Sequence, residues 1–255
     1  MPRRTIAREV TLEGAGLHEG LPTRLVLRPA PAGVGVRFRR ADLPGSEPIP
    51  VHVSAREERP RRTAIVRGAA EVHTVEHLMA AVSGLGVTDL EVEVDRVEVP
   101  GMDGSARDFE AALREAGLRD LEGEAPVLKL DRVVEVSDKS GARVVAMPCP
   151  GRLVLEYHLD YGGDCPPSRV EVEVTPETVA KDLLPARTFC LEKEALMLKA
   201  AGLGKGANTT NTLVIGKDGK PLENELRFPD EYARHKALDL LGDLTLLGAR
   251  LEARV

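Results

Sequence analysis

The sequence predicts an α+β fold that is built twice, as a sandwich of two domains that each pack a β-sheet against helices. Three observations lead to this expectation. Each half begins with three β-rich segments bounded by glycine or proline. Each half then reaches a helical segment that begins near a histidine and leads into one more strand. The turns between early strands are also alike, PAPAG in the first half and PCPG in the second. We therefore expect domains at residues 1–123 and 124–255.

The first half is expected to contain four strands and two helices. Its strand segments are rich in β-branched residues or alternate apolar with polar residues. Its first helical segment, VEHLMAAVSGLG, carries an apolar face and reaches glycine at its end. In order, the expected elements are strands at 8–14, 23–29 and 33–40, a helix at 75–86, a strand at 88–94 and a helix at 107–117.

The second half repeats this plan with an insertion. Its expected elements are strands at 128–138, 142–148 and 152–161, a helix at 233–248 and a strand at 249–255. The insertion, at about 191–219, contains an amphipathic helix at 191–204 and a strand at 210–216. The loop and helix that follow the last strand of the first half have no counterpart before Val255. We therefore expect a chain that is truncated at its C-terminus.

Composition excludes several classes of protein. A net charge of −6 and a pI of about 5.6 argue against a general nucleic-acid-binding protein, which needs basic surface to meet phosphates. No apolar run approaches the roughly 18 residues of a membrane span, and the basic start has no apolar signal region. Cys149, Cys165 and Cys190 form neither an even set nor a close-spaced pair. We expect a cytoplasmic protein with reduced thiols.

The segment HTVEHLMAA contains two histidines, His73 and His77, and a glutamate, Glu76. This order matches the H-x-x-E-H motif of one class of zinc metallopeptidases, in which both histidines lie on one helix. Thr74 is a favourable helix N-cap, however, and a helix that begins there leaves His73 outside. The short motif also matches by chance in many sequences. The peptidase interpretation is therefore the weaker one, and His77 needs another partner.

That partner is predicted in ARHKALDLLGDL. His235, Asp239 and Asp243 recur every four residues and so fall near one helical face, although an exposed acidic stripe would give the same pattern. The duplication places the helices of His77 and His235 at equivalent positions in the two domains. Packing these domains face to face would bring His77, His235 and Asp239 together in an active site between the domains. Three nitrogen and oxygen ligands with one open position are typical of catalytic zinc.

With these motifs the chain resembles the UDP-3-O-acyl-N-acetylglucosamine deacetylases, the zinc amidases of early lipid A synthesis. The resemblance covers nearly the whole chain and depends on several motifs in the same order. They are GAGLHEG, LRPAPAGVGVRF, TVEHLMAA, MDGSA, ARTF and LRFPDEYARHKALDLLGDL. It implies a duplicated α+β fold with small insertions, a UDP-acyl-glucosamine substrate and release of acetate from its N-acetyl group.

The resemblance also implies roles for individual residues. Zinc would be held by His77, His235 and Asp239, with Fe²⁺ as a possible substitute because one ligand is a carboxylate. Glu76 matches the general base and Thr188 the hydroxyl that stabilises the oxyanion. Phe189 matches a residue that lines the substrate site, and Lys236 and Asp243 match polar residues of the active site. The segment 191–219 corresponds to the insert that shapes the acyl-chain passage.

Two features depart from the family pattern. Family members carry a Gly-His pair shortly after the strand that here ends at Val255, and that histidine is thought to act as a general acid beside the counterpart of Asp243. Ala64 stands where some members have a cysteine. Two hypotheses therefore stay open: a deacetylase, and a noncatalytic or impaired relative that binds metal or nucleotide-sugar. We expect a monomer with no nucleic-acid partner.

Overall fold

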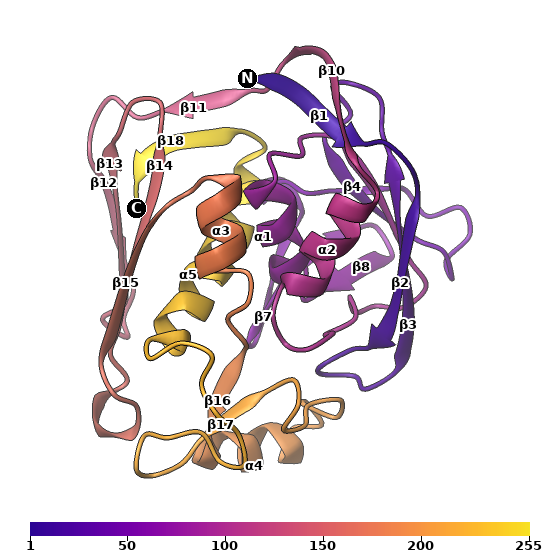
Figure 1. Cartoon of the computed structure of the whole chain (residues 1–255). Coiled ribbons are helices and arrows are strands. Elements are labelled where there is room, and N and C mark those ends of the chain that lie inside the picture. Colours follow the sequence, from indigo (N-terminus) through magenta and orange to yellow (C-terminus); the bar gives the residue numbers. More distant parts are fainter.

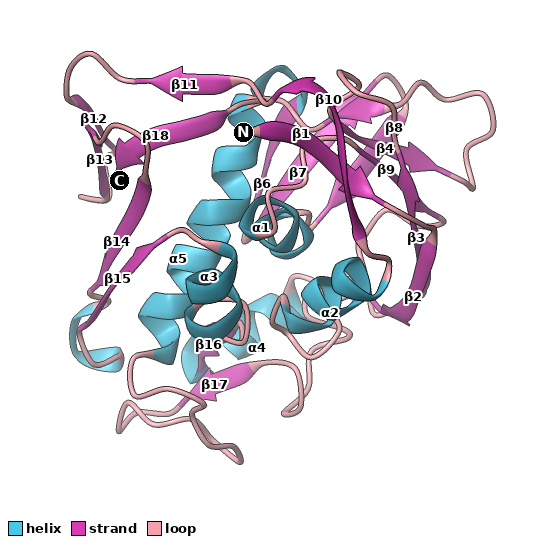
Figure 2. Cartoon of the chain, turned by 45° about the horizontal axis from the view of Figure 1, so that its top comes forward, coloured by secondary structure: helices cyan, strands magenta, loops and turns pink.

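The computed structural model of the chain has an α+β architecture in which helices lie between two β-sheets (Figure 1). It describes the backbone of residues 1–255 and every side chain except that of Asp164. Seen from a second direction, the helices still occupy the middle of the molecule, with one sheet on either side (Figure 2). This confirms the predicted fold class.

The sheet of the first half has five strands in the order β2–β3–β9–β4–β5. These strands are β2 Val10–Ala15, β3 Pro22–Pro29, β9 Leu90–Val94, β4 Val36–Arg40 and β5 Ile49–Pro50. Strand β3 pairs antiparallel with β2 and β9, whereas β4 pairs parallel with β9. The central strand β9 alternates buried Leu90, Val92 and Val94 with partly exposed glutamates, so one of its faces lies on the core.

The sheet of the second half repeats this order as β12–β13–β18–β14–β15. These strands are β12 Val134–Ser137, β13 Arg143–Pro148, β18 Arg250–Arg254, β14 Leu153–Leu159 and β15 Ser168–Glu173. The pairing directions also match, since β13 is antiparallel to β12 and β18 while β14 is parallel to β18. A further strand, β11 Val127–Lys129, pairs parallel with β18. The predicted duplication is therefore present in the topology.

Smaller elements complete the molecule. In the first half they are β1 Pro2–Ile6, which pairs with β10 Leu118–Glu124, the three-stranded sheet of β6 Arg56–Arg59, β7 Arg62–Arg67 and β8 Ala70–His73, the 3₁₀ turn η1 Val53–Ala55, and α2 Arg107–Glu115. In the second half they are α3 Pro176–Asp182, the turns η2 Gly162–Asp164 and η3 Thr245–Leu247, and the insertion of β16 Phe189–Leu191, α4 Glu192–Ala200 and β17 Leu213–Ile215. Apart from Glu124, the last residue of β10, which pairs with Pro2, every strand pairing found in the described residues joins segments of the same half. The domain boundaries themselves stay a prediction.

Two helices join the halves. Helix α1, Glu76–Gly84, and helix α5, Glu231–Leu244, make the most extensive helix–helix contact in the molecule. Gly242 permits this contact, because a Cβ atom there would lie 2.1 Å from the backbone oxygen of Glu76. The close approach places the first turn of α1 against the C-terminal part of α5, next to the turns that carry the predicted site residues.

The sequence prediction was wrong in detail at several places. Segment 128–138 forms two strands, β11 and β12, because the chain leaves β18 and turns to pair with β13 instead. Helix α5 ends at Leu244 and is followed by the turn η3. Strands β1, β5, β6–β8, β10, β15 and β16 and helix α3 were not predicted. Among the described residues, helices long and apolar enough to cross a bilayer are absent.

Candidate metal centre and active site

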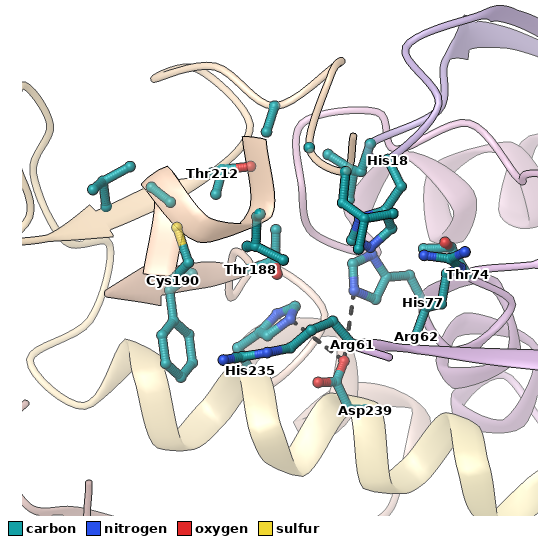
Figure 3. A pocket seen from close by; sticks show the side chains of 18 of the residues that line it. His18, Arg61, Arg62, Thr74, His77, Thr188, Cys190, Thr212, His235 and Asp239 are labelled. Carbon is teal, nitrogen blue, oxygen red and sulfur yellow. Dashed lines mark ion pairs between the residues drawn. The ribbon is translucent and has the colours of Figure 1, made fainter. Parts of the chain in front are cut away.

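A pocket of about 450 Å³ lies where the two halves meet the insertion. The residues at its base come from α1 and α5, and its walls come from the β6–β7 hairpin, from β16 and from α4 and the loop after it. Figure 3 shows the base of the pocket, where His77 and His235 approach Asp239 from different directions. All eight predicted site residues line this pocket: Glu76, His77, Thr188, Phe189, His235, Lys236, Asp239 and Asp243.

His77, His235 and Asp239 form a compact cluster whose candidate ligand atoms all lie within 4.8 Å of one another. The Nε2 atom of His77 lies 3.5 Å from Oδ1 of Asp239, and Nε2 of His235 lies 3.4 Å from the same oxygen. The two imidazole rings are nearly perpendicular, with centroids 5.0 Å apart. Zinc bonds of about 2.0–2.1 Å in a tetrahedron place ligand atoms roughly 3.3–3.4 Å apart. The two nitrogen–oxygen distances therefore fit a shared metal.

The polar atoms around the cluster orient its ligands. The backbone oxygen of Ala186 can only accept, so Nδ1 of His235, 3.0 Å away, carries the proton and leaves the Nε2 lone pair facing Asp239. Lys236 Nζ donates to Oδ2 of Asp239 over 2.8 Å. Oδ1 of Asp239 is buried and accepts no hydrogen bond from the described side chains or backbone. A buried carboxylate oxygen without a donor is costly unless a cation faces it, so the residues present suit a metal.

Charge and burial set the protonation of the cluster. Burial alone would raise the pKa of Asp239, but the neighbouring His235 and Lys236 outweigh it and hold that pKa well below its ordinary value. Burial lowers the pKa of His235 to about 4, so this ring is neutral near pH 7. Burial also acts to lower the pKa of His77, but the Asp239 carboxylate raises it above its ordinary value. An ionised carboxylate and a neutral imidazole are the forms that bind metals.

Two further carboxyl groups, Glu76 and Asp243, face the cluster from opposite helices. Burial raises the pKa of Glu76 to about 8, and partial desolvation at the pocket raises that of the more exposed Asp243 to about 6. Thr63 of β7 links them, because its N–H donates to Oε2 of Glu76 over 3.1 Å and its hydroxyl donates to Oδ1 of Asp243 over 2.6 Å. Acids with raised pKa values beside a metal cluster are suited to proton transfer near neutral pH.

Thr188 and Phe189 are fixed by a buried ion pair that precedes them. Arg187 donates through Nε to Oε1 of Glu231 over 2.9 Å, and Glu231, in the first turn of α5, is fully buried. The Thr188 N–H donates to the backbone oxygen of Gly104 over 2.8 Å. The Phe189 ring lies 6.2 Å from the His235 ring and 5.0 Å from the Tyr232 ring, centroid to centroid. These contacts hold both residues at the pocket wall beside the cluster.

The expected N-cap at Thr74 is wrong. Helix α1 has Val75 as its N-cap, without a side-chain cap hydrogen bond, and Thr74 has a left-handed φ of 57°. The Thr74 hydroxyl is used elsewhere, since it donates to Oε1 of buried Glu98 over 3.1 Å. His73 nevertheless lies outside the helix, at the end of β8, and its Nε2 is 2.6 Å from Glu71. The H-x-x-E-H spacing therefore does not place His73 in the cluster.

The sequence analysis missed the hairpin that forms one wall of the pocket. Arg61, Arg62 and Thr63 line it there, and His18 lines it from the loop after β2. A signal for the hairpin exists in RPRRTAIV, where a proline precedes a β-branched run. The functional residues within it could not be singled out, because their position in the pocket depends on contacts between distant parts of the chain.

An α+β chain with a buried His–His–Asp cluster at the base of a pocket has the donor set of a mononuclear metal hydrolase. Comparison with known proteins places it more closely. A family profile described as UDP-3-O-acyl N-acetylglycosamine deacetylase matches residues 3–255. The chain belongs to this family.

Relatives named UDP-3-O-acyl-N-acetylglucosamine deacetylase are similar over nearly the whole chain. The relative from Anaeromyxobacter sp. (strain Fw109-5) is 37% identical over 247 residues, which are 96% of this chain and 80% of that protein. The relative from Geobacter sp. (strain M21) is 38% identical over 258 residues, 99% of this chain and 83% of that protein. A relative from Brucella melitensis biotype 1 is 38% identical over 250 residues, with shares of 96% and 86%.

Proposed function

We propose that this chain is a zinc-dependent deacetylase that hydrolyses the N-acetyl amide of UDP-3-O-(3-hydroxyacyl)-N-acetylglucosamine and releases acetate. This is the committed deacetylation step of lipid A synthesis. The observation that carries the proposal is the cluster of His77, His235 and Asp239, with its unsatisfied carboxylate oxygen, in a member of this family. Fe²⁺ could replace Zn²⁺ because the donor set contains a carboxylate.

The metal, when bound, would polarise the amide carbonyl and lower the pKa of water. Glu76 then accepts the proton of the attacking water, because it is buried beside His77 and its Oε2 is held by the Thr63 N–H. The water oxygen joins the acetyl carbon, the C–N bond breaks, and the amine nitrogen takes up a proton. Asp243 lies on the opposite helix and, together with Glu76, provides the carboxyl groups that can move that proton.

The walls of the pocket supply the remaining roles. The Thr188 hydroxyl lines the cavity beside His235 and would stabilise the oxyanion as a hydrogen-bond donor. Lys236 offers a partly exposed ammonium group, held by Asp239, for contact with polar parts of the substrate. The Phe189 ring closes one side next to His235 and would contact the sugar.

A second part of the pocket is apolar, and we assign it to the acyl chain. It is lined largely by the insertion, through Ala195 and Leu198 of α4, Leu203 and Ala207 of the following loop, and Val214 of β17. A hydrocarbon chain gains free energy from transfer into such a lining, at about 0.8 kcal/mol for each buried methylene. The substrate is thus expected to place its amide at the cluster and its acyl group along α4.

The proposal is tested by measuring bound zinc and acetate release from UDP-3-O-acyl-N-acetylglucosamine in the same samples. Glu76→Gln should retain zinc, since the three proposed ligands are intact, but should lose about 10²–10⁴-fold in rate. Asp239→Ala should lose affinity for zinc. His73→Ala should keep both zinc and activity.

Three outcomes would contradict the proposal. If Glu76→Gln cleaves as fast as its parent at full zinc occupancy, the proton-transfer role is wrong. A zinc-loaded parent that binds the substrate but releases no acetate would favour the noncatalytic relative instead. If His73→Ala loses zinc while His235→Ala retains it, the peptidase interpretation is favoured instead.

A further inference from the structure

An ion pair connects the two sides of the pocket above the cluster. Arg61, at the tip of the β6–β7 hairpin, donates through Nη2 to Oε1 of Glu194 in the first turn of α4. The Arg61 side chain is 44% exposed and the Glu194 side chain 20% exposed, so the pair is partly shielded from solvent. In Figure 3 the Arg61 side chain runs across the front of the pocket. The contact joins the first half of the molecule to the insertion.

Arg61 occupies a backbone position that does not favour arginine. Its φ is 62°, and Pro60 precedes it in the turn between β6 and β7. A proline followed by a residue with positive φ is typical of a type II turn, in which glycine or asparagine is preferred at the second position. A non-glycine residue in this conformation stores strain, and such strain is found where a side chain has a specific role. A long cationic side chain at the hairpin tip reaches Glu194, whereas glycine could not.

The partner helix is weakly held by packing. None of the nine residues of α4 is buried, and the most extensive contacts of α4 are with its neighbours in sequence, β16 and β17. The loop after α4 is fixed to the first half by backbone hydrogen bonds from Lys205 to His18 and from Gly206 to Leu17, each 3.1 Å long. The insertion thus has a rigid attachment beyond α4 and an ion pair at the start of α4.

We propose that the Arg61–Glu194 pair is a latch that holds α4 against the first half and thereby sets the width of the apolar part of the pocket. Ala195 and Leu198, on the same helix, line that part of the pocket. An outward movement of α4 would widen the space between these side chains and the opposite wall. The latch therefore limits the length of the chain that this part of the pocket accepts. The identification of that chain as an acyl chain rests on the proposed function.

Two single variants and their combination test the latch. Arg61→Asn keeps a residue that tolerates the left-handed conformation but is too short to reach α4. Glu194→Gln removes the charge and keeps an amide oxygen that can accept the Leu191 N–H, which now donates to Oε2 over 3.1 Å. Glu192→Gln is the matched control, because Glu192 carries the same charge in the same turn and lies outside the pocket lining.

The first readout is amide hydrogen exchange across residues 192–200, which needs no substrate. Both single variants should exchange about two- to five-fold faster there, as expected for loss of a partly exposed ion pair, and the double variant should exchange no faster than either one. High salt should reduce the difference from the parent, because it screens the pair. Glu192→Gln should exchange like the parent. Unchanged exchange in both latch variants overturns the proposal.

The second readout is kcat/KM on substrates whose acyl chains differ by two to four carbons. In the latch variants, the ratio of kcat/KM for the longer chain to that for the preferred chain should rise about two- to five-fold. An unchanged ratio, in variants that do exchange faster, overturns the assignment of chain-length selection to the latch. A zinc-loaded parent that releases no acetate removes the proposed function, whereas the exchange result would still support or overturn the latch itself.

Discussion

The two halves share one strand order but differ greatly in what they bury. More of the buried apolar residues belong to the first half, including the fully buried Phe38 and Phe109, although Leu155, Leu238 and Leu241 of the second half are also fully buried. Most of the large apolar side chains that are exposed come from the second half, including Val136 at 65% and Val144 at 50%. Helix α2 packs on β2 in the first half. The strand of the second half that is equivalent to β2 is β12, and all four of its residues are exposed. The same topology thus buries fewer apolar side chains in the second half than in the first, although both halves contribute to one continuous core.

This difference separates the requirements of the site from those of stability. The site needs α1 and α5 in contact. The first half supplies α1 and the second half supplies α5. The free energy of unfolding depends instead on buried apolar area, of which the first half has the larger share. We infer that the first half contributes the larger share of the stability, and that the second half contributes a smaller share together with residues of the pocket. The expectation of a monomer stays a prediction, and the exposed apolar strands make it worth measuring.

The largest expected effect compares core with exposed strand. Phe109 of α2 is fully buried, so Phe109→Ala should lower the free energy of unfolding by about 3–5 kcal/mol. Val136→Ala, on the exposed β12, should change it by less than about 0.5 kcal/mol. Urea unfolding at equilibrium measures both. Comparable losses for the two variants would mean that β12 is covered in solution, and the contrast between the halves would fail.

The second expected effect concerns the contact that joins the halves. Gly242→Ala places a Cβ atom 2.1 Å from the Glu76 oxygen, so α1 and α5 must separate. Overpacking of this kind costs about 1–3 kcal/mol, and the movement should also weaken zinc binding by displacing His77 from Asp239. Gly163→Ala is the control, because its Cβ would meet open space. Unaltered zinc affinity in Gly242→Ala would show that the cluster tolerates helix movement.

The smallest expected effect compares two similar turns. In Asp103-Gly-Ser105 and in Asp138-Lys-Ser140, the aspartate Oδ1 accepts both the N–H and the hydroxyl of the serine. Burial would raise the pKa of Asp103, but Ser105 and Arg227 of the second half outweigh it, so that pKa lies below its ordinary value. Asp138 is exposed and has no such partner from the other half among the described contacts.

The pH dependence follows from the sign of this shift. A depressed pKa in the folded state stabilises the fold above the pKa of the unfolded chain, and this contribution is lost as the pH falls through the folded-state pKa. Asp103→Asn should therefore cost about 1–2 kcal/mol near pH 7, and the difference from the parent should shrink toward acidic pH. Asp138→Asn should have a smaller effect, because the Asp138 carboxylate is exposed and its hydrogen bonds are local. A pH-independent loss in Asp103→Asn would show that packing, and not the charge, is responsible.

How far the sequence predicts this molecule differs between regions. Segments with strong periodicity, such as 75–86, 107–117 and 233–248, were predicted as helices and appear as α1, α2 and α5 with shifted ends. The short strands β6, β7 and β8 were missed, because their local pattern is weak and they are stabilised mainly by pairing with one another. The error at Thr74 has a similar origin, since buried Glu98, distant in sequence, binds its hydroxyl.

By itself the sequence determined the duplicated plan and the spacing that puts His235, Asp239 and Asp243 on one helical face, because both follow from local periodicity. Only the tertiary structure decided that His77 faces them, since this depends on Gly242 allowing two helices to approach closely. It also decided which polar groups surround the cluster, as with Thr63 between Glu76 and Asp243. Contacts of this kind join residues far apart in the chain, and no local pattern encodes their distances.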